Sequence, residues 1–110
     1  MLPGFKALKL YKGDTFSLRL TISADGDPYD LTGHTFISQI KEKGKSTIAA
    51  TFTCTIENAV DGTLLVVLPS SESSKLNPLK KYEYDIEMNN DGSKSTIVNG
   101  PIIVVREVSS

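Results

Sequence analysis

The stretch YEYDIEM at residues 82–88 alternates without exception: aromatic and aliphatic side chains hold the even positions and acidic side chains the odd ones. Successive side chains of a β-strand point to opposite faces, so this pattern predicts a strand with one buried and one solvated face. The runs 16–22 and 48–56 alternate in the same way, and 36–40 does so more weakly. Together they indicate an all-β protein.

Two further runs, Leu64–Leu68 and Ile102–Val105, are apolar at every position. Such strands lie at the centre of a sheet or are covered on their second face. Their alternate side chains cannot all reach one core, which makes them candidates for an interface with a partner. These candidates are Leu65, Val67, Ile103 and Val105. The segments 5–11 and 94–98 could add edge strands.

Asp-Gly pairs at residues 25–26, 61–62 and 91–92 separate the strand-like runs and predict tight turns, because both residue types tolerate left-handed backbone. Seven or eight short strands with such spacing predict an antiparallel β-sandwich of immunoglobulin-like character. With 110 residues, we expect the whole chain, 1–110, to form a single domain.

The segment 69–78 breaks the alternation: it is polar, lacks β-branched residues and has a proline at each end. It predicts a crossover between the sheets with one short helical turn around 70–76, capped by Ser70 or Ser71 and stopped by Pro78. Leu76 would anchor the crossover in the core. Tyr82 follows the crossover, where a tyrosine of an immunoglobulin-like sandwich turns its hydroxyl back to the crossover backbone.

Charge and composition exclude several function classes. Twelve basic and thirteen acidic residues leave no basic excess for binding nucleic acid, and no apolar run is long enough to span a bilayer. We therefore expect neither a nucleic-acid nor a membrane partner.

Few side chains are suited to catalysis or metal binding. His34 is the single histidine, and no nucleophile or orienting acid stands near it in the sequence. Cys54 lies on an apolar strand face, where a thiol packs as a small hydrophobe. The odd-numbered carboxylates of 83–87 could help hold a hard cation, but a solvated face balanced by Lys41, Lys43 or Arg19 is the simpler interpretation. We expect no enzyme activity, cofactor or metal.

The stretch 11–22, YKGDTFSLRLTI, opens with Gly13-Asp14 before an alternating strand, and PYDLTG follows at 28–33 after an Asp-Gly turn. With the Tyr82 strand, the turn at 91–92 and a last strand led by Gly100, this arrangement resembles the N-terminal domain of phage baseplate upper proteins. Each motif has a local physical reason. Gly13 and Gly33 permit left-handed backbone, while Asp14 and Asp30 can accept bonds from nearby N–H groups.

The resemblance implies a structural module of a phage or prophage tail or baseplate, assembled in the bacterial cytoplasm and carried in the virion. Larger relatives continue into coiled or receptor-binding regions, so it implies the mounting part. The expected partners are other tail or baseplate proteins, or further copies in a trimer or hexamer. The alternative is a carbohydrate- or host-surface-binding module, for which Tyr11 and Tyr29 are the free aromatic candidates, since Tyr82 and Tyr84 should face inward.

Overall fold

The computed structural model describes residues 4–106, which are built almost entirely of β-strands. Within these residues the elements follow one another as β1 (Gly4–Phe5), β2 (Leu8–Tyr11), β3 (Phe16–Thr21), β4 (Ser23–Ala24), β5 (Asp27–Pro28), β6 (Thr35–Glu42), β7 (Ile48–Asn58), β8 (Thr63–Leu68), α1 (Ser70–Ser73), β9 (Tyr82–Asn90) and β10 (Ser93–Val105). Each strongly alternating run of the sequence forms a strand, as predicted.

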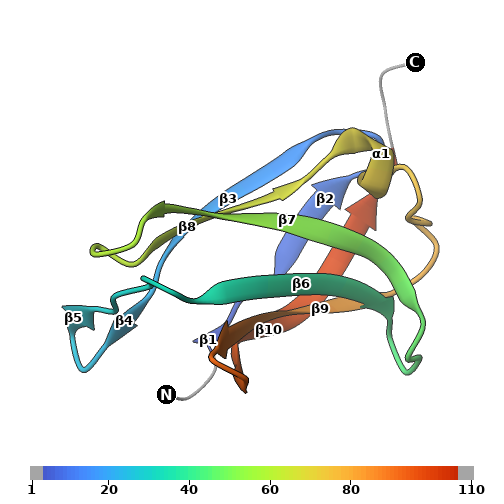
Figure 1. Ribbon diagram of the computed structural model, residues 1–110. Helices are drawn as coiled ribbons and strands as arrows, with labels where there is room; N and C mark the ends of the chain where they lie inside the picture. Colours follow the sequence, from blue (N-terminus) through green and yellow to red (C-terminus); the bar gives the residue numbers. More distant parts are fainter. Residues whose placement is uncertain (1–3, 107–110) are drawn as a thin grey trace.

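The strands form one curled sheet in the order β1-β10-β9-β6-β7-β8-β3, with β2 also paired to β10, and β4 and β5 make a separate small hairpin. Strand β7 makes the corner: its first half pairs with β6 and its second half with β8. The sheet therefore folds into two layers, with β3, β8 and β7 above β2, β10, β9 and β6 (Figure 1).

The predicted immunoglobulin-like, purely antiparallel sandwich is wrong in its strand directions. Strands β1 and β2 run parallel to β10, with Gly4 opposite Val98 and Leu8 opposite Ile102, so the sheet is mixed. Alternation in a sequence shows which side chains face inward but carries no information on pairing direction. The segment 94–98, expected as a separate edge strand, is the first part of β10, which continues past a bulge between Thr96 and Val98.

The core lies between the two layers and is apolar. Phe52 of β7 packs edge-on against Phe16 of β3 and Tyr84 of β9, with ring centroids 6.4 and 5.9 Å apart. The even-numbered side chains of 82–88 are all buried, as the alternation predicts. Removing such a side chain from water stabilises the fold by about 1.5–3 kcal/mol.

Ile48 is an exception to the predicted inward faces. The sequence places it on the same face as Ala50 and Phe52, yet 49% of its surface is exposed. A bulge opposite Ile40 and Lys41 adds one residue to β7, so that Ile48 pairs with Lys41 and turns to the outer face.

The predicted helical turn is present as α1, but it is shorter and capped differently. Pro69 occupies the N-cap position without a side-chain cap, so neither Ser70 nor Ser71 caps the helix. The helix ends at Ser73, well before Pro78. Leu76 is fully buried, as expected of an anchor.

Candidate functional site

The Gly13–Asp14 corner joins β2 to β3 and contacts the crossover. Gly13 has a φ of +89°, as its predicted turn role requires. Its N–H donates to the hydroxyl of Ser73 at 3.1 Å, and the same hydroxyl donates to the carbonyl oxygen of Asp14 at 2.7 Å. Asp14 thus serves the corner through its backbone, whereas the sequence suggested its carboxylate. Ser73, which sequence reasoning missed, is fully buried between the two segments.

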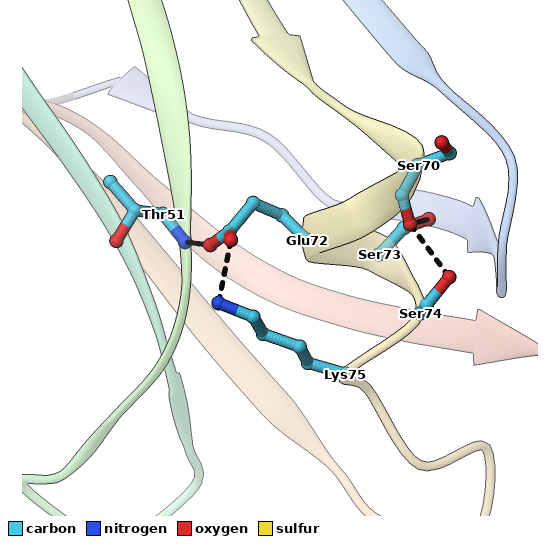
Figure 2. A network of polar contacts seen from close by, with 6 residues as sticks. All are labelled: Thr51, Ser70, Glu72, Ser73, Ser74 and Lys75. Carbon is cyan, nitrogen blue, oxygen red and sulfur yellow. Dashed lines mark hydrogen bonds and ion pairs between the residues drawn. The ribbon is translucent and has the colours of Figure 1, made fainter.

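Glu72 fixes the other side of α1. One of its carboxylate oxygens accepts the backbone N–H of Thr51 on β7 at 2.9 Å, and the other lies 2.6 Å from the ammonium of Lys75 (Figure 2). The bonds from Lys75 and Thr51 lower the pKa of Glu72 below its ordinary value. The crossover is therefore bonded both to the Gly13–Asp14 corner and to β7.

Tyr82 holds the end of the crossover, as predicted. Its hydroxyl accepts the backbone N–H of Asn77 at 2.8 Å. On the same face of β9, the Tyr84 hydroxyl donates to the carbonyl oxygen of Lys6 at 2.8 Å, and burial raises the pKa of Tyr84 to about 12. Both tyrosines thus face inward with structural bonds.

The Asp30–Gly33 corner also forms as predicted. An Asp30 carboxylate oxygen accepts the N–H and the hydroxyl of Thr32 at 2.9 and 2.6 Å, which lowers the pKa of Asp30. Gly33 has a φ of +79°. His34 lies half-buried beside the corner, with Nδ1 3.1 Å from the Thr32 carbonyl oxygen and Nε2 3.5 Å from the Tyr29 hydroxyl. Its ring is held by this corner.

Cys54 is partly buried on β7 among core residues. Burial raises the pKa of its thiol to about 11. At neutral pH the sulfur is therefore protonated and is a poor nucleophile.

The four interface candidates lie on the outer faces of the two layers. Ile103 of β10 is 64% exposed, and Val105 on the same side of that strand is half-buried. Leu65 and Val67 of β8 are half-buried between β7 and β3, opposite Thr55 and Thr53. Both runs lie on central strands, as their continuous apolar character predicts, and the two pairs of side chains do not share one surface.

A groove of about 580 Å³ lies on the outer face of β6, β9 and β10. Phe5 of β1, 75% exposed, stands at this groove together with polar side chains that include Gln39, Lys41, Asp85 and Asn99. Sequence reasoning missed this site because its residues come from four strands. The aromatic candidates Tyr11 and Tyr29 are not among its lining residues.

The acidic face of β9 forms one wall of this groove. Partial burial raises the pKa of Asp85; the charge of Lys41 opposes that shift and the charge of Glu87 adds to it. Lys41 also lies opposite Glu83 in the β6–β9 register. Arg19, expected as another balancing cation, instead pairs with Glu57, with Nη2 3.1 Å from Oε2.

Within residues 4–106, no three His, Cys, Asp or Glu side chains come together in an arrangement that could hold a metal ion. None of the helices in the same range is long and apolar enough to cross a bilayer.

The structure is a small mixed β-domain in which the Gly13–Asp14 and Asp30–Gly33 corners form tight turns. Neither a protein-family model nor a curated protein matches this sequence. Among solved structures, the N-terminal domain of phage TP901-1 ORF48 is similar, with a TM-score of 0.55 and 14% sequence identity. The match covers 94% of this chain and 98% of that domain. The chain therefore shares its fold with the N-terminal domain of a phage protein.

Proposed function

We propose that this chain is a non-enzymatic structural module of a phage tail or baseplate, which acts by docking to other tail proteins. The observation that carries the proposal is the shared fold, which spans nearly the whole of both chains. The corner motifs at residues 13–14 and 30–33, which suggested baseplate upper proteins from the sequence, form the turns expected of them.

The chemistry of the described residues is consistent with a docking role. The His34 ring contacts its own corner, and the Cys54 thiol is protonated at neutral pH. Exposed apolar side chains such as Ile103, by contrast, offer contact area to a partner. We infer that the module works through surface complementarity and that its place is the virion tail.

The direct test is to locate the chain in particles of the phage that encodes it. Antibodies against the purified domain should label one end of the tail in electron micrographs, and the chain should remain with purified tails. Its absence from intact particles would contradict the proposal.

A variant separates docking from folding. Ile103→Asp should remove the chain from assembled tails, because a charge on this exposed site opposes burial against a partner. The free domain should keep its stability within about 1 kcal/mol, since the site is mostly exposed. Leu65→Asp tests the β8 face by the same incorporation assay, and because Leu65 is half-buried the stability of this free variant is measured as well. Normal incorporation of both variants would exclude these two faces as docking surfaces.

Carbohydrate binding is the second candidate, and the groove beside Phe5 favours it. An exposed ring next to carboxylate, amide and ammonium groups offers stacking together with hydrogen bonds, which is what a sugar needs. Phe5→Ala should abolish binding on a glycan array, while Tyr29→Ala should leave it intact. If no glycan binds the wild-type domain, this alternative fails.

A further inference from the structure

Strand β3 forms one edge of the curled sheet, and among the described residues its only paired neighbour is β8. The Ile22 N–H donates to the Gly62 carbonyl oxygen at 2.8 Å, so Ile22 and Gly62 form a hydrogen-bonded pair at the end of this antiparallel ladder. Since hydrogen-bonded pairs alternate along such a ladder, the backbones of Phe16, Leu18 and Leu20 bond to β8. Those of Ser17, Arg19 and Thr21 therefore direct their N–H and C=O groups away from the sheet.

This edge lacks the usual protection against pairing with another chain. Strand β3 contains no proline, and its six pairs with β8 run without a bulge. Arg19 is its single charged residue, and the guanidinium reaches across β8 to Glu57 on β7, away from the free edge.

The opposite edge of the sheet is different. It is split between β1 and β2, with a break at residues 6–7, and it carries the exposed Lys9. Interruptions and lysines are devices that prevent edge-to-edge pairing. Of the two edges, β3 is the one open to another strand.

The inward face of β3 would also gain from a further strand. Phe16, Leu18 and Leu20 are only partly buried, although they pack against the core. The residues of β8 that lie opposite them are only 0–2% exposed; these are Leu68, Val66 and Leu64. A strand added beyond β3 would cover this remaining apolar surface.

We propose that the strand added here is β3 of a second copy of this chain, paired antiparallel about a two-fold axis at Leu18. Leu18 then meets Leu18 of the partner subunit, and Phe16 meets Leu20 of the partner subunit. On the outer face, Ser17 lies opposite Arg19 of the partner subunit. This dimer rests on the docking role proposed above, and it would be one of the contacts that the module makes in the tail.

Apolar contacts and charge together favour this register. A two-fold axis at Arg19 would bring two like-charged Arg19 residues onto opposite positions and would leave Phe16 without a partner in β3 of the second copy. Pairing of β3 with β2 of another copy would bring Arg19 close to Lys9. The axis at Leu18 avoids both conflicts while every apolar side chain of β3 meets another.

Substitutions at Ser17 test the register. Ser17→Glu should lower the dimer dissociation constant by about fivefold and Ser17→Lys should raise it by about fivefold, because each change acts on two symmetry-related Ser17–Arg19 contacts. Sedimentation equilibrium of the full chain measures both constants. Thr53→Glu and Thr53→Lys are matched controls: Thr53 is exposed on the same face, two strands from the edge, and should leave the constant unchanged.

Amide hydrogen exchange tests the strand directly. With rising protein concentration, the amides of Ser17, Arg19 and Thr21 should become protected, while that of the exposed Lys94 should not. A chain that stays monomeric up to about 1 mM, a dimer whose β3 amides exchange freely, or equal constants for the two Ser17 variants would each overturn the inference. Any of these results would leave the tail-labelling experiment unaffected, so failure of the dimer and failure of the docking role can be told apart.

Discussion

Asp85 is a carboxylate that folding makes harder to ionise. It lies in the wall of the groove, where partial burial raises its pKa above the ordinary value of 3.8. A raised pKa contributes stability that is complete below pH 3.8 and is lost as the pH rises through the pKa of the folded state. At neutral pH, the charge on Asp85 therefore destabilises the fold.

Asp85→Asn should increase the free energy of unfolding at pH 7, and the gain should vanish at about pH 3, where the native side chain is also neutral. Urea unfolding at the two pH values measures the difference. Asp91→Asn is the control, because it removes one negative charge at an exposed turn where asparagine also accepts a positive φ. An equal gain from both variants would indicate an effect of net charge and contradict the role of burial.

Residue roles that depend on near neighbours in the sequence were predictable. The Asp30 turn and the hydroxyl bond of Tyr82 join residues two and five positions apart, so the sequence contains the information. Leu76 stands out locally as the apolar residue of a polar segment, and it is buried. Ser73 was missed because its partner Asp14 is 59 residues away. In the sequence it is one of four serines in a polar segment and has no distinguishing mark.

Among the elements, α1 shows how a very short helix can be held in place. Four residues cannot form a stable helix alone, since nucleation is unfavourable. The bonds of Ser73 to the Gly13–Asp14 corner and of Glu72 to β7 provide the stability that the isolated helix would not have. The crossover thus depends on tertiary contacts.

Ser73→Ala should cost about 1–3 kcal/mol of stability, because it leaves the Gly13 N–H and the Asp14 carbonyl without their buried partner. Denaturant unfolding gives the value. Ser74→Ala is the matched control, since that exposed hydroxyl bonds only within its own turn, to the Ser70 carbonyl. Similar losses in both variants would show that helix propensity, rather than the contact with the corner, stabilises this segment.

Strand positions were predictable to within a few residues, but bulges were not. An extra residue in β7 turns Ile48 outward, and another bulge lies between Thr96 and Val98 in β10. A bulge depends on how two strands are paired, so alternation within one strand gives no sign of it.

For the whole molecule, the closing contact is the one between the first strands and the last. Gly100 of β10 lies so close to the Lys6 carbonyl that a methyl group on its Cα would overlap that oxygen. The same oxygen accepts the Tyr84 hydroxyl, and the Lys6 N–H donates to the Asn99 carbonyl at 2.9 Å. This glycine is needed because of the close approach of two strands.

Gly100→Ala should therefore loosen the N-terminal edge, with a loss of about 1–3 kcal/mol. Amide exchange of residues 6–12 should accelerate more than that of β7. Gly4→Ala serves as the control, because a Cβ there meets only the Ile97 carbonyl oxygen at 3.6 Å, an ordinary contact. Equal effects of the two substitutions would point to a general loss of β-strand flexibility in place of a local overlap.

At this scale the sequence predicted the all-β class and the central position of the two apolar runs, but not the mixed sheet. The order and direction of strands depend on contacts across the whole chain, such as Leu8 with Ile102, which no local pattern specifies. The groove beside Phe5 was unpredictable for the same reason.

The pairing of β2 with β10 also affects the time at which the domain can fold. A ribosome synthesises a chain from the N-terminus at about 5–20 residues per second, so β2 is made several seconds before its partner β10. During that interval the inward side chains of Leu8 and Leu10 have no layer to pack against. The nascent chain must therefore keep an apolar strand from other chains until β10 has been synthesised.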